Sequence, residues 1–345
     1  MQGTIPIMLA ESYLHQLDPF AIQFTETLGI RWYGLAYITA FAVAWILIKW
    51  MGKEKLSPIQ PDKAGDFVFA GVLGVLIGGR LGYCFFYDPT LLYTFTDGFP
   101  WWRALAIQDG GMASHGGMLG VLIAFMVWGK RNNVSLLHLI DIGSLVAAPG
   151  LFFGRVANFI NGELWGKQLP QEYQPNPPAW SVKYPTEITE VWIQNPELYN
   201  DQLQQLEPLR TTVAGENSFH QTIVHELYNG NQVVIDHVQP HLTAWYPSQL
   251  FQAFTEGPVL FLILIAVWWK PKSPGVVASC FLLFYGITRI ITEVYRQPDD
   301  GIALLITLSR GQLLSVLMVF FGAFMLLILL KQNQAKLGGF QKVFK

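Results

Sequence analysis

Charged residues are scarce in this chain. Lys, Arg, Asp and Glu make up 13% of its 345 residues, roughly half the share that is typical of a soluble domain. The formal net charge is −2, so no basic surface predicts binding to nucleic acid. Hydrophobic residues make up 52% of the chain and aromatic residues 14%. This composition indicates a polytopic membrane protein.

Cysteine is almost absent. The two cysteines, Cys84 and Cys280, both lie inside apolar runs, where a thiol normally behaves as a small buried hydrophobic group. His237 and His241 have a helical ligand spacing, but a proline lies between them and no acidic third ligand accompanies them. We therefore expect no disulfide framework, no bound metal ion and no cofactor.

Long apolar runs dominate the sequence instead. Seven segments reach about 20 residues, the length that a helix needs to cross a bilayer. No Lys or Arg precedes Arg31, so the chain lacks the charged start of a cleaved signal peptide. We predict an all-α polytopic membrane protein with seven transmembrane helices. The predicted spans are residues 30–50, 67–87, 111–129, 136–157, 247–269, 276–295 and 311–330.

Basic residues are distributed unevenly between the connections. Lys53, Lys55 and Lys63 follow the first predicted span, and further Lys or Arg residues follow the third, fifth and seventh. The connections 88–110 and 296–310 contain arginine but no lysine. Because basic residues favour the cytoplasmic side, we predict an N-terminus outside the membrane and a cytoplasmic C-terminus.

One connection is long, and this orientation places it outside the membrane. Residues 160–246 are rich in proline, and short alternating runs such as residues 232–237 favour strands. We expect a small extracytoplasmic insert that contains some β structure. Its residues 190–235 have the composition of a solvated loop, so we expect them to be dispensable for chemistry. The predicted organisation is four helices in residues 1–159, this insert, and three helices with a cytoplasmic tail in residues 247–345.

Polar side chains collect at the outer ends of five predicted helices. These residues are Tyr33, Arg80, His115, Arg155, Asn158, Glu163, Arg289, Glu293 and Arg296. His138 and Asp141 are exceptions near the inner end of the fourth span. Ionisable groups at membrane depth cost several kcal/mol unless they are paired, and they usually mark a functional site. The sequence therefore predicts a site that faces the outer leaflet.

The spacing of Arg289, Glu293 and Arg296 places them on one helical face. A salt-bridge ladder within one helix would explain them without a ligand. Arg80 and Arg155 lie at the same predicted depth, however, so arginines outnumber glutamates there. A guanidinium binds phosphate in bidentate fashion, and a phospholipid head group is the anion available at that depth. We therefore favour a phospholipid-binding site.

Glycines surround His115 in the segment GGMASHGGMLG, residues 110–120. Close helix packing would account for the glycines, and a lone histidine in a span can be a packing residue. The same glycines would also open the imidazole to a ligand, and histidine is suited to accept a proton near neutral pH. Arg80, in Gly78-Gly-Arg-Leu-Gly-Tyr83, has the same two interpretations.

Five sequence blocks resemble those of the prolipoprotein diacylglyceryl transferases, in the order of that family. They are Arg31-Trp-Tyr-Gly34, Gly79-Arg-Leu-Gly-Tyr83, Asp109-Gly-Gly-Met-Ala-Ser-His-Gly-Gly117, Gly154-Arg-Val-Ala-Asn-Phe-Ile-Asn-Gly-Glu-Leu-Trp-Gly166 and Tyr285-Gly-Ile-Thr-Arg-Ile-Ile-Thr-Glu-Val-Tyr-Arg-Gln-Pro-Asp299. The resemblance covers nearly the full length. It implies a seven-span enzyme of the bacterial plasma membrane. Such enzymes move the diacylglyceryl group of phosphatidylglycerol to the lipobox cysteine of a secreted prolipoprotein, the first step of lipoprotein maturation, and release glycerol 1-phosphate.

The resemblance also implies residue roles. Arg155 and Arg289 would hold the phosphate, the first oriented by Asn158 and Glu163 and the second by Glu293. His115 would take the proton of the acceptor thiol, with Glu163, Glu293 or bound water as alternatives, and Tyr33 would contact head group or acceptor. The implied catalytic residues are His115, Arg155, Arg289, Glu163 and Tyr33. The implied phosphatidylglycerol-binding residues are Arg155, Asn158, Arg289, Glu293, Arg296, Arg80 and Gly166.

The chain departs from the family at one motif. Tyr246-Pro-Ser-Gln-Leu-Phe-Gln252 replaces the usual His-Pro-Ser-Gln-Leu-Tyr-Glu, and the insert is longer than usual. A lipid or anion transporter could use the same arginines without chemistry, but transporters often contain paired repeats and sites at the midplane. No internal repeat is visible here. A structural scaffold would leave the arginines unexplained, so we favour the transferase interpretation.

Overall fold

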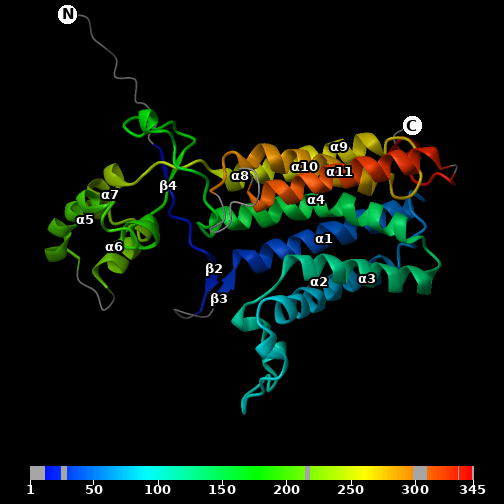
Figure 1. The fold of residues 1–345 in the computed structure, drawn as a ribbon, viewed down its shortest axis with the longest axis horizontal. Coiled ribbons are helices and arrows are strands. Elements are labelled where there is room, and N and C mark those ends of the chain that lie inside the picture. The colour runs from blue at the N-terminus through cyan, green and yellow to red at the C-terminus, as the bar shows by residue number, and fades with distance from the viewer. Residues whose placement is uncertain (1–11, 25–28, 214–217, 298–308, 333, 344–345) are drawn as a thin grey trace, which may run out of the picture. The chain divides into compact units, whose positions relative to one another are not determined.

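The computed structural model describes residues 12–24, 29–213, 218–297, 309–332 and 334–343 (Figure 1). Most of them are helical. The helices are α1 (Trp32–Lys53), α2 (Ala64–Phe86), α3 (Ser114–Asn132), α4 (Leu136–Ile160), α5 (Asn200–Leu206), α6 (Phe219–Tyr228), α7 (Gln232–Val238), α8 (Ser248–Phe254), α9 (Leu260–Val267), α10 (Val276–Glu293) and α11 (Arg310–Lys331). The strands are β1 (Tyr13–Leu14), β2 (Phe20–Gln23), β3 (Gly29–Arg31) and β4 (Val182–Lys183). A π-helical turn, Thr255–Val259, joins α8 to α9.

Six helical segments of the described chain are long and apolar enough to cross a membrane. They are Trp32–Lys53, Ala64–Phe86, Leu136–Ile160, Ser248–Val267, Val276–Glu293 and Gly311–Lys331. Each overlaps one of the predicted spans, so a mostly helical, multi-pass membrane protein is confirmed. The seventh predicted span, residues 111–129, corresponds to α3. That helix forms, but its four glycines and the terminal Lys130 and Arg131 lower its hydropathy.

Glycines on α2 and α3 let the two helices pack closely side by side (Figure 1). A Cβ atom added to Gly74 would lie 2.7 Å from the carbonyl oxygen of Gly120, and one added to Gly82 would lie 2.7 Å from Gly116 Cα. No side chain fits at those separations. Gly116, next to His115, therefore serves helix packing, as one of the two sequence interpretations predicts.

The polar residues near the inner end of α4 have structural partners. Asp141 accepts hydrogen bonds from the backbone nitrogens of Gly275 and Ala278, at 2.7 and 2.8 Å, and so caps the start of α10. His138 bonds the hydroxyl of Ser57 at 2.8 Å. These contacts explain why two ionisable residues lie away from the predicted site. Both cysteines are buried and free.

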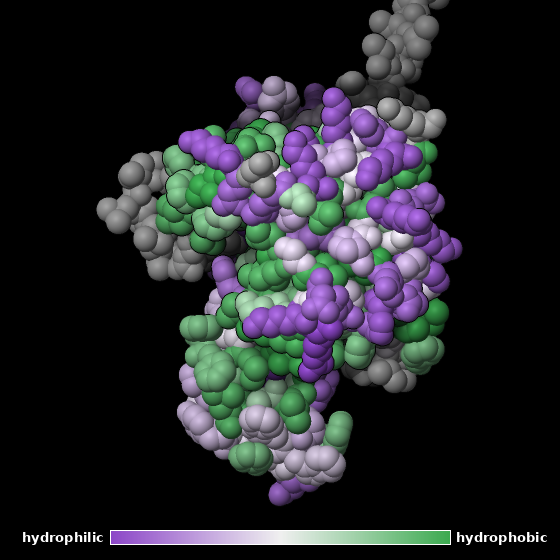
Figure 2. All heavy atoms as spheres, turned by 90° about the vertical axis from the view of Figure 1, so that its right-hand side faces the viewer, coloured by the Kyte–Doolittle hydropathy of each residue, from purple (hydrophilic) through white to green (hydrophobic). Residues whose placement is uncertain are grey.

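Hydrophilic side chains gather at one end of the helices, the end that faces the viewer in Figure 2. The connections α1–α2, α3–α4 and α9–α10 and the segment after α11 all lie at this end (Figure 1). Exposed basic residues of these connections are Lys53, Lys55, Lys63, Lys130, Arg131, Lys270, Lys331, Lys336 and Lys342.

The insert is mainly helical and has its own apolar core. Helices α5, α6 and α7 surround buried side chains that include Trp192, Leu206, Ile223 and Leu227. Its named strand β4 is two residues long and pairs in parallel with β1. Residues 232–237, which we interpreted as strand-like, belong to α7. A β-containing insert is therefore not confirmed, and the interpretation of residues 190–235 as a solvated loop is wrong.

The chain divides into two compact units. Unit 1 comprises Met1–Tyr37, Leu151–Glu256 and Thr288–Leu314, and unit 2 comprises Ile38–Gly150, Gly257–Ile287 and Ser315–Lys345. Unit 1 thus contains the insert and α8 together with parts of α1, α4, α10 and α11. The predicted division into residues 1–159, 160–246 and 247–345 stays a prediction.

Candidate active site

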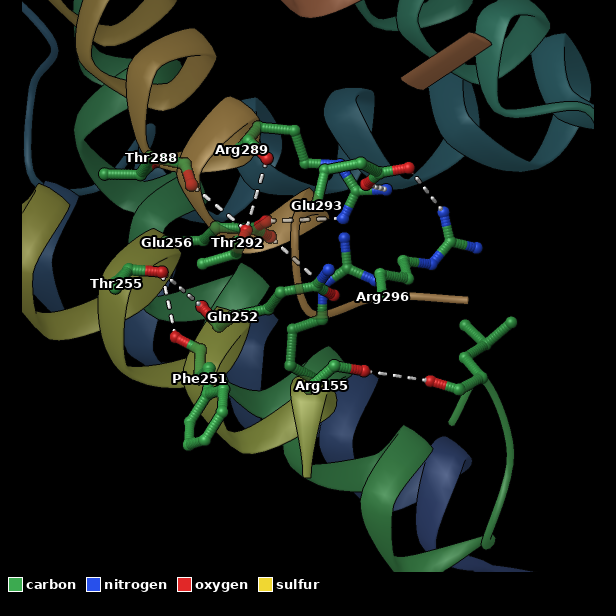
Figure 3. A network of polar contacts seen from close by, with 12 residues as sticks. Arg155, Phe251, Gln252, Thr255, Glu256, Thr288, Arg289, Thr292, Glu293 and Arg296 are labelled. Atoms are coloured by element: carbon green, nitrogen blue, oxygen red, sulfur yellow. Dashed lines mark hydrogen bonds and ion pairs between the residues drawn. The ribbon is translucent and has the colours of Figure 1, made fainter. Parts of the chain in front are cut away.

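A buried network of ion pairs joins three helical segments of unit 1. Arg155 Nε donates to Glu256 Oε2 at 3.0 Å, and Arg289 Nη1 lies 3.6 Å from Glu256 Oε1. Arg289 Nη2 lies 3.1 Å from Glu293 Oε2, and Arg296 Nη1 lies 3.6 Å from Glu293 Oε1. Figure 3 shows the arginine side chains turned toward the two carboxylates. The structure thus brings together Arg155, Arg289, Glu293 and Arg296, four of the residues predicted from sequence.

Glu256 is the residue that sequence reasoning missed. Its side chain is fully buried, and its carboxylate bridges Arg155 and Arg289. A signal was present, because Glu256 is the one ionisable residue between Pro247 and Val267. It lies in the π-helical turn Thr255–Val259. Pro258 in that turn has no N–H to donate to the preceding turn, which favours the wider helix, and such turns are frequent at functional sites.

The ion pairs join three guanidinium groups to two carboxylates and leave some polar atoms without hydrogen bonds. Among the described residues, Gln252 Nε2, Glu256 Oε1, Arg289 Nη1 and Glu293 Oε2 are buried and have no hydrogen-bond partner. Most buried polar atoms in proteins have one, and leaving such an atom unsatisfied costs about 1–3 kcal/mol. The same network would gain hydrogen bonds from a ligand that carries oxygen atoms. This feature distinguishes it from a purely structural salt-bridge ladder.

A second polar cluster joins α1 to the end of α4. The hydroxyl of Tyr33 donates to Glu163 Oε1, and Asn158 Nδ2 donates to both the Tyr33 hydroxyl and Glu163 Oε1, the latter at 2.8 Å. Gly162 and Leu164, with φ of +62° and +55°, turn the backbone on either side of Glu163. Asn158 and Glu163 thus bond Tyr33 and each other. Their predicted orientation of Arg155 stays a prediction.

Gly166 holds the end of the same sequence block against two other segments. It forms an antiparallel bridge with Arg296. A Cβ atom at this position would lie 2.8 Å from both Tyr246 Cβ and the carbonyl oxygen of Tyr295. Only glycine fits there. Gly166 therefore places its strand beside Arg296 by backbone contact, and the ring of Tyr246, which replaces the family's histidine, packs on Tyr295 with centroids 5.2 Å apart.

Arg80 has backbone partners in unit 2. Its guanidinium donates to the carbonyl oxygens of Ala104, Gly110, Gly111 and Arg103 at 2.5–3.0 Å. Its exposed fraction is 6%. These bonds hold the connection between α2 and α3 in place, which is a structural role. Binding of a lipid phosphate by Arg80 stays a prediction.

His115 also belongs to unit 2. It is exposed in the first turn of α3, where the packing glycines remove neighbouring side chains. The arginine network belongs to unit 1, so the assignment of His115 to the same site stays a prediction. Within the part of the chain that the structure describes, no three His, Cys, Asp or Glu side chains form a group that could hold a metal ion.

Apolar spanning helices and a buried arginine–glutamate network together indicate a multi-pass membrane protein with a charged candidate site. The family model described as prolipoprotein diacylglyceryl transferase matches residues 19–328. The chain belongs to this family of membrane transferases, as the five sequence blocks predicted.

Curated relatives match over nearly their full length. A protein of Bdellovibrio bacteriovorus is 36% identical over 342 residues, which cover 95% of this chain and 97% of the relative. Proteins of Xylella fastidiosa (strain 9a5c) and Ralstonia pickettii (strain 12J) are 32% and 36% identical, and the matches cover 91% and 90% of this chain and 93% of each relative. All three relatives are named phosphatidylglycerol–prolipoprotein diacylglyceryl transferase.

Proposed function

We propose that this protein transfers the diacylglyceryl group of phosphatidylglycerol to the lipobox cysteine of prolipoproteins and releases glycerol 1-phosphate. This reaction is the first step of lipoprotein maturation. The observation that carries the proposal is the bridge from Arg155 through Glu256 to Arg289. It places two guanidinium groups against one buried carboxylate, next to buried polar atoms that have no hydrogen-bond partner among the described residues.

Arg155 and Arg289 would bind the phosphate of the donor lipid. Guanidinium groups match phosphate oxygens with paired hydrogen bonds. In a dry environment their positive charge stabilises the negative charge that develops on a leaving phosphate far better than it would in water. Glu293 pairs with Arg289 and Arg296 and would keep them oriented. The arginines thus supply binding and transition-state stabilisation.

The chemical step would be a displacement at glycerol C3. His115 would accept the proton of the acceptor thiol, whose pKa in water is about 8.5, and the resulting thiolate would attack C3. A carbon–sulfur bond forms while the bond between C3 and the phosphate oxygen breaks. The electron pair leaves on the phosphate, which departs as glycerol 1-phosphate. Glu163, Glu293 or a bound water are the alternative proton acceptors.

Tyr33, Asn158 and Glu163 would contact the reacting groups as one unit. Their hydrogen bonds fix the Tyr33 hydroxyl against a carboxylate. A fixed hydroxyl and amide can orient a head group or an acceptor peptide. Arg296, Arg80 and Gly166 would complete the phosphatidylglycerol-binding set, Gly166 through its backbone.

The topology belongs to the same proposal. We place seven spans, including α3, in the bacterial inner membrane, with the N-terminus outside and the C-terminus in the cytoplasm. The exposed basic residues at one end of the helices (Figure 2) support a cytoplasmic assignment of that end. The site would then face the outer leaflet, where secreted prolipoproteins and phosphatidylglycerol meet.

One assay tests the function. Purified protein is incubated with phosphatidylglycerol and a synthetic lipobox peptide, and the products are glycerol phosphate and a peptide heavier by one diacylglyceryl group. A peptide with serine in place of the lipobox cysteine is the control and should stay unmodified. Absence of both products with the cysteine peptide would overturn the proposal.

A further inference from the structure

Gln252 and Glu256 lie four residues apart on one helical segment, α8 and the π-helical turn that follows it. Both side chains are buried, with exposed fractions of 2% and 0%. Gln252 Nε2 and Glu256 Oε1 each have no hydrogen-bond partner among the described residues. A buried amide and a buried carboxylate are costly to leave unsatisfied. Two such atoms on residues 252 and 256 of one helical segment therefore point to a ligand.

A neighbouring glutamine shows that the helix can satisfy such a side chain. Gln249 is also buried, with 1% exposed. Its Nε2 donates to the backbone oxygen of Glu163 at 2.7 Å and lies 3.3 Å from the hydroxyl of Tyr184. One glutamine of α8 is thus part of the fold, whereas the amide nitrogen of the other has no hydrogen-bond partner among the described residues. We therefore interpret the Gln249 amide as structural and the Gln252 amide as a candidate for ligand binding.

An amide donor and a carboxylate acceptor together complement a hydroxyl group, which accepts one hydrogen bond and donates another. An ammonium head group would offer donors only and would leave the Gln252 N–H unpaired. Glu256 also pairs with Arg155 and Arg289, so a phosphate held by these arginines would have its head-group hydroxyls close to the Glu256 carboxylate.

We propose that Gln252 and Glu256 bind a hydroxyl of the lipid head group and determine selectivity for polyol phosphodiesters. The proposal rests on the proposed function and names the part of the donor that this pair recognises. Two carboxylates one turn apart would repel each other, whereas the Gln252 amide adds a donor beside the Glu256 acceptor.

The test compares two donor lipids that differ only in head-group hydroxyls, phosphatidylglycerol and phosphatidyl-1-propanol. Wild-type protein should prefer phosphatidylglycerol by about 100-fold or more in kcat/KM, because the propanol head group leaves buried polar groups unpaired. Gln252→Met keeps the length of the side chain without its polar atoms. It should lower kcat/KM for phosphatidylglycerol roughly 10- to 100-fold and leave the value for phosphatidyl-1-propanol within about threefold.

Gln249→Met is the matched control. It removes hydrogen bonds that the fold uses, so it should lower the unfolding temperature while the ratio of the two kcat/KM values stays at the wild-type level. Gln252→Met should unfold at or above the wild-type temperature, because the amide nitrogen that it removes is buried and has no hydrogen-bond partner among the described residues. Loss of folding in Gln252→Met would identify a structural amide and overturn the proposal.

The remaining outcomes are also decisive. An unchanged lipid ratio in a folded Gln252→Met variant would overturn the inference and leave the proposed function intact. A higher KM for the lipobox peptide, with an unchanged ratio of the two kcat/KM values for the lipids, would mean that Gln252 binds the acceptor peptide. This outcome would also overturn the inference. If wild-type protein modified the peptide with neither lipid, the proposed function itself would fall, and the inference with it.

Discussion

Asp141 accepts the backbone N–H of Ala278 at 2.8 Å, although 137 residues separate them in the chain. Its second oxygen accepts the N–H of Gly275, so one side chain of α4 satisfies two donors at the start of α10. Asp141→Ala should therefore lower the free energy of unfolding by about 1–3 kcal/mol. Thermal unfolding in detergent measures the change. Asp66→Ala, which breaks an exposed pair with Lys63, should cost less than about 1 kcal/mol, and equal losses would contradict the capping role.

Arg155→Lys should fold and lose most of its activity. A lysine can still pair with Glu256, but an ammonium cannot form paired hydrogen bonds with phosphate. We expect kcat/KM for phosphatidylglycerol to fall on the order of 10²-fold or more. Arg210→Lys is the control, because Arg210 forms its paired bonds with Glu207 on the exposed surface of the insert. Wild-type turnover in Arg155→Lys would contradict the proposal that Arg155 binds the phosphate.

His115→Gln should lower turnover on the order of 10²-fold or more if His115 removes the thiol proton. The amide keeps a hydrogen-bonding side chain of similar reach but cannot accept a proton. The rate of transfer to the lipobox peptide at one fixed pH measures the change. His115→Asn tests a packing role. Near-normal turnover in His115→Gln would mean that another group removes the proton.

Glu187 should make the insert less stable as pH rises. It is fully buried, and burial raises its pKa from 4.5 to about 7, although hydrogen bonds from Thr243, Trp245 and Trp192 oppose the shift. Because the folded state favours the protonated form, this contribution to stability is complete below the unfolded pKa and is lost as pH approaches 7. The expected loss is about 3 kcal/mol.

Tryptophan fluorescence during denaturation at pH 4.5, 6 and 8 measures this effect, since Trp192 and Trp245 both donate to Glu187. Glu187→Gln cannot ionise and should flatten the pH dependence of the unfolding midpoint. Glu172 is an exposed carboxylate of the same insert, so Glu172→Gln should keep the pH dependence of the wild-type unfolding midpoint. A wild-type midpoint that does not change over this range would contradict the prediction.

Cysteine labelling tests the orientation. Gln221→Cys in α6 should react with an impermeant thiol reagent in intact spheroplasts, whereas Gln332→Cys, after α11, should not. Both positions are exposed, and the native cysteines are buried. Labelling only at residue 332 would show that the orientation is the reverse of the proposed one and that the site faces the inner leaflet.

The spanning helices were predictable because each is a long apolar run, and the arginines were predictable because charge at that depth is rare. The carboxylate partner of Arg155 was not predictable. Glu256 lies 101 residues away, and the pairing depends on how α4 and α8 pack, which spacing along one helix does not reveal. Sequence reasoning therefore found the cations of the site and missed the carboxylate that joins them.

The insert was mispredicted for a different reason. Residues 232–237 alternate enough to suggest a strand, but the buried side chains of this segment are Val234 and Val238, while Val233 is 62% exposed. A spacing of four residues is the repeat of a helical face. In so short a segment both periods fit the sequence, and packing against the insert core decides between them.

The pairing of β1 with β4 determines when the insert can fold during synthesis. His15 bonds the backbone oxygen of Phe159, 144 residues later, and Leu14 is buried in the insert core. The ribosome makes the first strand well before its partners exist. The insert must therefore complete its core late, after α1 to α4 have been synthesised. Truncation through residues 12–15 would remove Leu14 and the β1 pairing from a core that is encoded mainly beyond residue 160.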